Sequence, residues 1–320
     1  MDLSIIIVNW NSEDYLRECI PSIDRWTAEV SYEVIVVDNA SPAISIDSIK
    51  EQFPAIKLIK SGKNLGFSGA NNIGFRESAG DYVLFLNPDT KLSSPAIDLI
   101  MKEAKRLPDA GIVGCRLLNG DLSVQTSSIM KFPRIWNSIL QIEYLRLRWP
   151  QLWGIGPLFS DRQPAEVEAV SGACMLMRRE VFEKIGRFSE EYFMYSEDVD
   201  LCYQAVRAGF KNYHLGHATM VHYGGKSSPG AWQTAMKTRA ELRFCRRNYG
   251  RMYSVLFRMA LVLNASARLT VLATVRLFAR AFHVKNALDS TWLRWSVILK
   301  TLVMQRGSRR DQPVLPTACG

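Results

Sequence analysis

Two short acidic motifs contain residue types that can carry chemistry. In the first, Asn87-Pro88-Asp89, a carboxylate follows the uninterrupted apolar run Tyr82–Leu86, a pattern typical of a strand buried on both faces. Because proline cannot donate to a sheet ladder, the strand should end before Pro88 and leave Asp89 at its carboxyl end, where ligands bind in open parallel sheets. A carboxylate there suits a hard divalent cation that also binds a diphosphate, since such a cation keeps positions for phosphate oxygens and water. A turn in which Asp89 only caps the next helix explains this motif equally well.

The second motif is Glu197-Asp198, which follows the residues Phe-Met-Tyr-Ser. Ser196 is a good N-cap, and carboxylates in a first helical turn are stabilised by the helix dipole, so capping alone explains the pair. The preceding aromatic residues nevertheless place both acids at the mouth of an aromatic pocket, where a carboxylate can act as a general base. Asp200 should point elsewhere on the helix, and we interpret it as structural.

The elements that must position these residues follow from the hydrophobic pattern. Apolar segments at residues 4–8, 32–37, 56–60 and 82–86 are predicted strands, and the segments between them are predicted helices, which indicates a doubly wound α/β half. Asn9, Asp38 and Asn87 follow three of these strands and should therefore lie in a row along one edge of the sheet. A dinucleotide-binding domain would need G-x-G-x-x-G after the first strand, where this chain has no glycine, so a nicotinamide or flavin enzyme is disfavoured.

The net charge of +9 over 320 residues is unevenly distributed. Residues 226–320 contain 17 lysines and arginines and three acids, whereas the first 225 residues are net acidic. A basic region permits anionic partners, namely a nucleotide, a nucleic acid or an acidic membrane surface. Six cysteines without C-x-x-C spacing argue against a zinc site or a disulfide framework and favour a reducing cytoplasm. The N-terminus enters a strand without a basic leader, so we expect no signal peptide.

Four segments resemble the nucleotide-sugar half of a family 2 (GT-A fold) glycosyltransferase in their order and spacing: SIIIVNWN, VIVVDNAS, NLGFSGANNIG and VLFLNPDT. The later segments VSGACMLMRREVFEKIGRFSEEYFMYSEDVDLC and HYGGKS resemble the bacterial rhamnosyltransferase-like branch, and the resemblance covers residues 3–228. It implies a mixed sheet flanked by helices and an inverting, metal-dependent transfer of one sugar from a nucleoside diphosphate. The branch suggests dTDP-L-rhamnose as donor, with a UDP-sugar (galactofuranose, GlcNAc or similar) next. The acceptor would be a saccharide or a polyprenyl-diphosphate-linked saccharide in cell-wall or O-antigen assembly.

The resemblance also implies roles for individual residues. Asp89, the one carboxylate in a motif that is usually Asp-x-Asp, and His222 would hold Mg2+ or Mn2+. Asp198 would be the catalytic base, with Glu197 orienting it or the acceptor. Asn9 would approach the nucleoside and Asp38 its base or ribose. The full implied nucleotide-sugar site is Asn9, Asn11, Asp38, Asn39, Asn64, Gly69, Asn71, Asn72, Asn87 and Lys226.

The last third is predicted to be helical, with a basic face. Arg251, Arg258, Arg276 and Arg280 fall within about 40° of one another on a helix, opposite an apolar face. The longest charge-free piece between Arg258 and Arg268 is too short to span a membrane. Such a helix suits the headgroup plane of an anionic membrane, while packing on the catalytic domain or on a second copy of the chain is the alternative. Few aromatic residues accompany the arginines, which argues against nucleic acid.

We therefore expect a GT-A catalytic domain at residues 1–228, with a nucleotide-binding half (1–90) and an acceptor half (91–228). A basic amphipathic helical region at 229–305 and a disordered tail at 306–320 should follow. The Q-x-x-R-W motif of processive synthases is absent, since residues 291–295 read TWLRW, so we expect a non-processive enzyme. We expect it to be cytoplasmic, peripheral on the inner face of a bacterial cytoplasmic membrane. A nucleotide-sugar-binding module without catalysis is the alternative from another class.

Overall fold

The computed structural model describes residues 1–42, 46–140, 147–160, 164–224, 230–281 and 289–304, without the side chains of 278–281. The chain divides into two compact units. The first contains Met1–Phe132 and Leu140–Ser228, and the second contains Pro133–Ile139 and Pro229–Gly320. Residues 133–139, which the sequence assigned to the acceptor half, therefore belong to the helical unit. Lys226 and the predicted tail at 306–320 lie outside the described residues.

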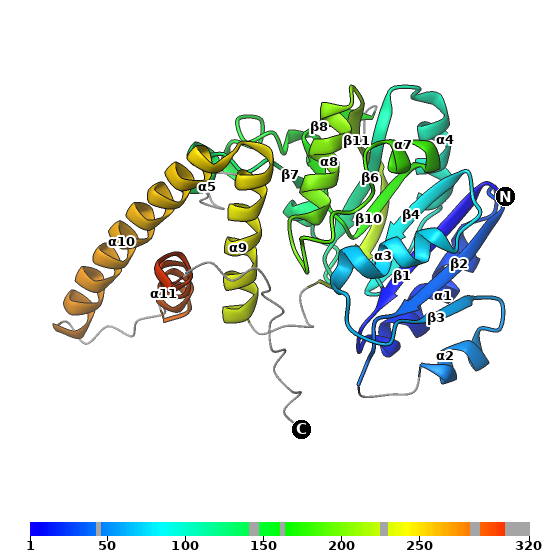
Figure 1. Cartoon of the computed structure of the whole chain (residues 1–320), viewed down its shortest axis with the longest axis horizontal. Helices are drawn as coiled ribbons and strands as arrows, with labels where there is room; N and C mark the ends of the chain where they lie inside the picture. The colour runs from blue at the N-terminus through cyan, green and yellow to red at the C-terminus, as the bar shows by residue number, and fades with distance from the viewer. Residues whose placement is uncertain (43–45, 141–146, 161–163, 225–229, 282–288, 305–320) are drawn as a thin grey trace. The chain divides into compact units, whose positions relative to one another are not determined.

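The described part of the first unit contains a nine-stranded mixed sheet in the order β3-β2-β1-β4-β10-β6-β11-β5, with β8 paired to β11 (Figure 1). Four parallel strands form one half: β1 (Leu3–Asn9), β2 (Tyr32–Asp38), β3 (Lys57–Lys60) and β4 (Tyr82–Leu86). The other half consists of β5 (Thr90–Leu92), β6 (Ala110–Leu118), β8 (Ala165–Val167), β10 (Cys174–Arg178) and β11 (Lys211–His222). A separate pair joins β7 (Ile129–Met130) to β9 (Ala169–Val170). All four predicted strands are confirmed.

Helices cover both faces of this sheet. Alternating residues of β1 show why: Ile5 and Ile7 join the core formed with α1 (Glu13–Trp26), α2 (Asp47–Gln52) and α4 (Ala96–Arg106). On the other face, α3 (Gly66–Arg76) packs on Ile35 and Val37 of β2 through Ala70. Phe85 of β4 contacts Phe182 of α7 (Arg179–Lys184), and α8 (Glu197–Arg207) packs against β6 and β11. The 3-10 turns Thr126–Ser128 and Gly156–Phe159 complete this unit.

Two loops next to the sheet have distinctive hydrogen bonds. Ser12 precedes α1, but its hydroxyl donates to the Trp10 carbonyl at 3.1 Å and does not cap the helix. A turn forms at Asn119, yet it is longer than a two-residue hairpin, because the Asn119 N–H bonds the Ser123 carbonyl at 2.8 Å. A single bridge from Leu118 to Val124 follows this turn in place of a second strand. The chain thus turns back along β6 only briefly, which brings residue 125 to the end of the sheet.

His214 in β11 provides a pH-dependent contribution to stability. Its side chain is buried, and neither ring nitrogen has a hydrogen-bond partner among the described residues. Burial, and secondarily the charge of Arg116, lowers the pKa of His214 to about 4. In the unfolded chain this histidine has an ordinary pKa near 6.5. Between about pH 6.5 and pH 4 the unfolded chain therefore binds a proton that the folded chain does not bind, and the free energy of unfolding falls as the pH drops through this range.

We expect His214→Leu to remove this contribution. Between pH 7.5 and pH 5 the parent should lose about 2 kcal/mol of unfolding free energy more than the variant, by proton linkage. Urea denaturation at the two pH values measures the difference. An equal loss in parent and variant would show that other groups control acid stability.

The second unit is helical in its described residues: α5 (Ile135–Ile139), α9 (Gly230–Asn248), α10 (Arg251–Ala281) and α11 (Asp289–Met304). The predicted outward basic face is wrong for two of its arginines. Arg258 donates to the Leu302 carbonyl of α11, and Arg276 pairs with Asp289 and lies 4.6 Å from the Trp292 ring. The expectation that no segment could span a membrane also needs correction, because Arg251–Leu277 is long and apolar enough by length and composition.

Candidate active site

The carboxyl ends of β1 and β2 meet as the sequence predicts. Asn9 and Asp38 are register partners, and Asn9 Nδ2 donates to Asp38 Oδ1 at 3.0 Å. The same amide donates to Glu13 Oε1 at 3.0 Å, and its oxygen accepts the Ser12 N–H at 3.2 Å, so the fully buried Asn9 is engaged within the protein. Ser41 Oγ donates to Asp38 Oδ1 at 2.6 Å. These contacts fix the Asp38 carboxylate, and Asn9 is the residue that orients it.

Asn11 lies directly after this pair, with a left-handed φ of 51°. Its backbone N–H donates to Ser41 Oγ at 3.0 Å. Its Oδ1 is buried and accepts no hydrogen bond from the described part of the chain. Leaving such an acceptor unpaired costs roughly 1–3 kcal/mol. Asn11 Oδ1 is therefore an unsatisfied acceptor beside the Asn9–Asp38 pair.

Asn39 and Asn64 build the loop that follows β3. Asn39 Oδ1 accepts the Leu65 N–H at 2.8 Å, while its Nδ2 donates to Asn64 Oδ1 at 3.0 Å. Gly66 has a φ of +71°, and a Cβ there would lie 2.1 Å from the Phe193 carbonyl oxygen, so glycine is required. The next residue, Phe67, donates its N–H to that carbonyl at 2.9 Å. The loop is thereby attached both to the end of β2 and to the segment before α8.

The predicted residues on α3 face the protein in different ways. Asn72 Nδ2 donates to the Phe188 carbonyl at 2.9 Å and to Glu190 Oε1 at 3.0 Å, which holds that segment against the helix. Asn71 Nδ2 donates to the Phe67 carbonyl at 3.0 Å. A Cβ on Gly69 would lie 2.9 Å from Leu65 Cβ, so the glycine permits close packing within its own helix. The side-chain amides of Asn71 and Asn72 are thus used by the scaffold.

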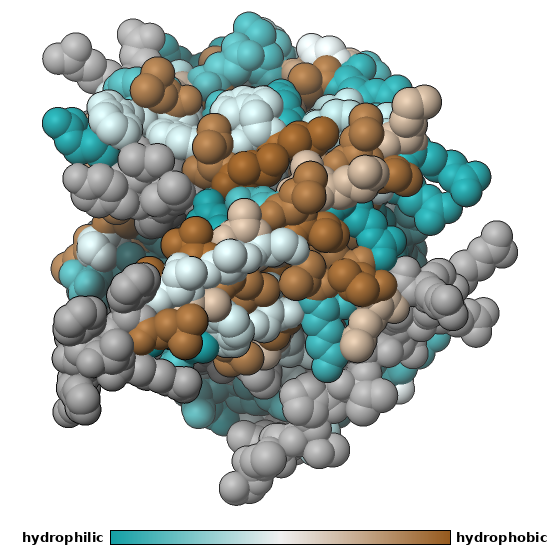
Figure 2. Space-filling view, turned by 90° about the vertical axis from the view of Figure 1, so that its left-hand side faces the viewer, coloured by the Kyte–Doolittle hydropathy of each residue, from teal (hydrophilic) through white to brown (hydrophobic). Residues whose placement is uncertain are grey.

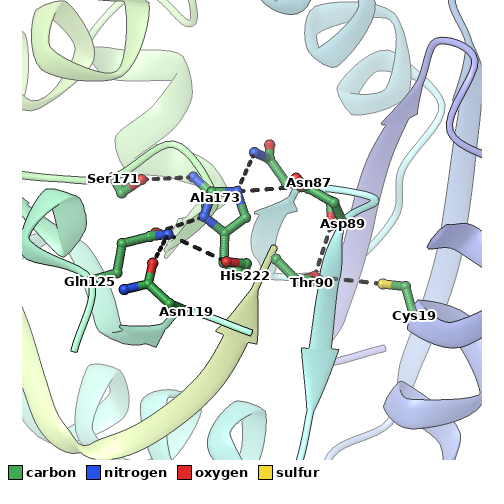
Figure 3. A network of polar contacts seen from close by, with 9 residues as sticks. All are labelled: Cys19, Asn87, Asp89, Thr90, Asn119, Gln125, Ser171, Ala173 and His222. Carbon is green, nitrogen blue, oxygen red and sulfur yellow. Dashed lines mark hydrogen bonds and ion pairs between the residues drawn. The ribbon is translucent and has the colours of Figure 1, made fainter. Parts of the chain in front are cut away.

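The structure brings Asp89 and His222 together at the opposite end of the row (Figure 3). Asn87 and Asp89 follow β4, and β5 continues from them to pair with the end of β11, where Thr90 and His222 are partners. His222 Nε2 lies 3.3 Å from Asp89 Oδ1 and 3.4 Å from Asn87 Nδ2. The Tyr223 N–H also donates to the Asp89 carbonyl at 3.0 Å. Residues more than 130 positions apart therefore form one polar cluster.

Gln125, which the sequence did not single out, sets the tautomer of His222. Gln125 Nε2 donates to Asn119 Oδ1 at 3.0 Å and to the His222 carbonyl at 3.3 Å, so its oxygen faces the ring. His222 Nδ1 lies 2.7 Å from Gln125 Oε1 and must carry the proton. In the neutral ring this leaves a lone pair on Nε2, which faces the Asp89 carboxylate and the Asn87 amide. Only the turn at Asn119 could have indicated this contact, because it returns the chain to the end of β6.

These residues fit a divalent cation. The His222 ring nitrogen and the Asp89 carboxylate oxygen, 3.3 Å apart, need a proton or a cation between them, and neighbouring ligands of an octahedral ion at about 2.1 Å are about 3 Å apart. The described residues contain no cluster of three or more His, Cys, Asp and Glu side chains. Asp89 and His222 therefore suit an ion whose remaining ligands are phosphate oxygens and water, as Mg2+ prefers.

Gln125→Leu should weaken metal binding because it removes the acceptor that holds the Nδ1–H tautomer of His222. Loss of such a hydrogen-bond partner typically costs about 10–100-fold in metal affinity. Mn2+ titration followed by electron paramagnetic resonance, with a nucleoside diphosphate present, measures it. Gln125→Glu keeps an acceptor at that position and should stay close to the parent. Equal Mn2+ affinity in Gln125→Leu and the parent would remove Gln125 from this role.

The acidic pair lies at the start of α8, on a strained backbone. Tyr195 and Ser196 both have left-handed φ, 72° and 63°, and Ser196 makes no side-chain cap, contrary to the prediction. Such conformations cluster at functional sites. Asp198 Oδ2 accepts the Gly172 N–H at 2.9 Å. Burial, and then the charge of Asp198, raises the pKa of Glu197 well above its ordinary value.

Asp200 is buried and accepts a hydrogen bond from the Tyr192 hydroxyl at 3.3 Å, in agreement with a structural role.

The break at residues 171–173, between β9 and β10, joins the two chemical centres. The Gly172 N–H binds Asp198 Oδ2, and one residue further the Ala173 carbonyl accepts the Asn87 N–H at 3.0 Å. A Cβ on Gly172 would lie 3.1 Å from Asp198 Oδ2, so glycine permits this approach. The carboxylate of Asp198 and the motif after β4 are therefore connected through two consecutive residues.

The parallel half-sheet thus has polar residues along its carboxyl edge, continues through the antiparallel pair β4–β10, and meets the acidic start of α8 through residues 172 and 173. The chain belongs to glycosyl transferase family 2, whose family model matches residues 4–186. N-acetylglucosaminyl-diphospho-decaprenol L-rhamnosyltransferase of Mycobacterium tuberculosis is 29% identical over 241 residues, which cover 71% of this chain and 77% of that protein. Rhamnosyltransferase WbbL of Escherichia coli is 26% identical over 269 residues, 78% of this chain and 98% of that protein.

Solved structures show the same fold. The mannosyltransferase PcManGT from Pyrobaculum calidifontis, in complex with GDP-Man and Mn2+, is similar with a TM-score of 0.60 at 15% identity, covering 94% of this chain and 86% of that chain. GalNAc-T7 with UDP, GalNAc and Mn2+ is similar with a TM-score of 0.56 at 17% identity, over 75% and 47% of the two chains.

Proposed function

We propose that this glycosyltransferase is inverting, dependent on a divalent metal and non-processive, and that it transfers L-rhamnose from dTDP-L-rhamnose. The acceptor is a saccharide or a polyprenyl-diphosphate-linked saccharide in cell-surface polysaccharide assembly. One observation carries this proposal: residues 171–173 connect Asp198 to the motif that contains Asp89. A base and a diphosphate-binding group are the two parts that an inverting displacement at a sugar carbon requires.

In this proposal, Asp198 accepts the proton of the acceptor hydroxyl while the hydroxyl oxygen bonds to C1 of the donor sugar. The bond from C1 to the diphosphate oxygen breaks on the opposite face, so the configuration at C1 inverts. A metal ion held by Asp89 and His222 would stabilise the negative charge on the departing nucleoside diphosphate. Asp38 and Asn11 Oδ1 would contact the nucleoside, since both lie at the edge of the parallel half-sheet.

The raised pKa of Glu197 supports Asp198 as the base. Burial raises the pKa of Glu197 and so favours its protonated form, and a protonated carboxyl cannot accept the acceptor proton. Glu197 would instead donate a hydrogen bond that orients Asp198 or the acceptor.

The names of the relatives support the donor and the acceptor. Both compared relatives are rhamnosyltransferases, and one is named for an acceptor linked to a polyprenyl diphosphate. A UDP-sugar is the second choice of donor. An acceptor of this kind would place the enzyme at the inner face of the cytoplasmic membrane.

A thermal-shift panel tests the proposal. dTDP-L-rhamnose, UDP-galactose, UDP-GlcNAc and GDP-mannose are compared, each with Mn2+ and with EDTA. A ligand at 100 times its Kd stabilises the folded state by about 2.7 kcal/mol, so dTDP-L-rhamnose with Mn2+ should raise Tm most. A shift with a UDP-sugar only would reassign the donor. No metal-dependent shift with any of them would reject the proposed site, and binding without turnover would indicate an inactive binding module.

A further inference from the structure

α10 turns large apolar side chains outward. Seven of them are at least half exposed: Met252, Val255, Leu256, Met259, Leu263, Val271 and Leu277. At 100° per residue all but Val271 fall within about 100° of one another on one face of the helix. Only 17% of the most apolar window of α10 is buried, so this helix is not the core of the second unit. Figure 2, which views the side on which α10 lies, shows hydrophobic residues gathered in a band. We call these six residues, without Val271, the apolar face.

Two threonine hydroxyls on the same side of α10 donate their hydrogen bonds within the helix and not to water. Thr270 Oγ1 donates to the Ser266 carbonyl at 3.1 Å, and Thr274 Oγ1 donates to the Val271 carbonyl at 2.8 Å. These hydroxyls therefore satisfy their hydrogen bonds inside the helix, as they do in an apolar environment. Among the described side chains, no charged residue shares the arc of the apolar face.

Three of the cations within α10 instead contact α11. Arg258 donates to the Leu302 carbonyl, Arg268 lies 4.6 Å from the Trp295 ring, and Arg276 lies 4.6 Å from the Trp292 ring. A helix exposed to water would place its arginines outward and its leucines inward. In α10 the pattern is reversed, as it is in segments that face lipid, where charged side chains pair inside the protein.

We propose that the apolar face of α10 docks on an anionic phospholipid bilayer, with its six side chains in the outer acyl region. The helix has 31 residues and is about 46 Å long, enough to lie in the interface over many lipids. The second unit contains 17 lysines and arginines and three acids, a charge that complements anionic headgroups. A second copy of the chain is disfavoured as occupant, because pairing would bring two strongly basic units together. The sequence assigned membrane contact to the arginines, whereas the structure assigns it to the apolar face.

Vesicle flotation of the full chain tests this surface. Vesicles of phosphatidylcholine with about 30% phosphatidylglycerol are used, and the bound fraction is measured at low salt and at about 1 M NaCl. Salt at that concentration screens exposed charges but leaves apolar insertion intact, so the parent should remain bound. Met259→Gln/Leu263→Gln removes two apolar side chains from the centre of the face and should reduce partitioning by about tenfold or more.

Two variants serve as controls. Val206→Gln makes the same kind of change at an exposed position of α8 in the first unit and should float like the parent. Met252→Gln/Leu256→Gln, one to two turns away on the same face, should reproduce the loss even if the first double variant folds poorly. Circular dichroism melting checks that each variant is folded.

Three outcomes would overturn the proposal. The first is that the parent stays free of vesicles or leaves them at high salt, since adsorption would then rest on arginines or be absent. The second is that both double variants float like the parent. The third is a parent dimer, detected by light scattering, that the double variants dissociate, because a second copy would then cover the face. Donor binding in the thermal-shift panel does not depend on lipid, so failure here leaves the proposed reaction untouched.

Discussion

Asp198→Asn is expected to lower kcat by about 10²–10⁴-fold, the usual contribution of a general base. The amide oxygen can still accept the Gly172 N–H, which Asp198 Oδ2 now binds at 2.9 Å, so the start of α8 should keep its structure. What the variant loses is a group that takes the acceptor proton. Donor affinity should therefore change little, and the effect should appear in turnover. Single-turnover rates with saturating donor, together with donor Kd, separate the two.

Glu197→Gln is the matched control for this prediction. Because burial raises the pKa of Glu197 and favours its neutral form, glutamine is the closest match to that form in charge and size. We expect a rate within several-fold of the parent. A rate for Asp198→Asn within threefold of the parent, combined with a large loss in Glu197→Gln, would transfer the role of base to Glu197.

The polar edge of the parallel half-sheet could be predicted from the sequence because its geometry is local. Each apolar run ends at a polar residue, and parallel strands place those ends side by side. Asn9 and Asp38 follow this rule directly, since they are register partners. The residues that then secure the edge, such as Ser41, are short polar side chains in a loop, and their partners depend on the exact path of that loop.

The cluster around His222 could not be predicted from local pattern. It requires β11 to pair with β5, and then a turn at Asn119 to return Gln125 to the imidazole. Both contacts join residues about 100 or more positions apart. The family resemblance indicated His222 and Asp89, yet it did not indicate the residue that sets the tautomer.

The outer face of α10 shows a different limit. Helical periodicity shows that the arginines of this helix lie on a different face from its apolar residues. It does not show which of the two faces is exposed. Only the position of α11 decides the matter, because its tryptophans and Asp289 provide partners for Arg268 and Arg276.

Several predicted ligand residues turn out to have scaffold contacts for a related reason. Asn39 connects its strand to the loop before α3, and Asn72 holds the segment that contains Phe188. Some asparagine side chains connect two backbone segments, and others bind a ligand. The sequence does not distinguish the two kinds, since both follow a strand or begin a helix. Asn11 is the exception in this set, since its oxygen is buried and has no partner among the described residues.

Asp89→Asn should abolish the metal-dependent part of donor binding. Asp89 is the one carboxylate of its motif, and an amide oxygen is a much weaker ligand for a hard cation than a carboxylate. The loss should exceed the roughly 10–100-fold expected from removing a hydrogen-bond partner of a ligand, as in Gln125→Leu. Calorimetric titration of dTDP with and without Mn2+ measures it. His222→Asn, which removes the other proposed ligand, should show a loss in the same direction.

The same titration in the presence of EDTA provides the control for this prediction. Asp38 and Asn11 lie at the ends of β1 and β2, away from the motif after β4 in sequence, so the nucleoside contacts should survive the substitution. Without metal, the parent and Asp89→Asn should therefore bind dTDP equally weakly, and only the parent should gain affinity when Mn2+ is added. If Asp89→Asn gains as much as the parent, the cation is held elsewhere or is not needed. The Asn87 amide would then be the partner of His222 Nε2, and the proposed route for stabilising the departing diphosphate would fail.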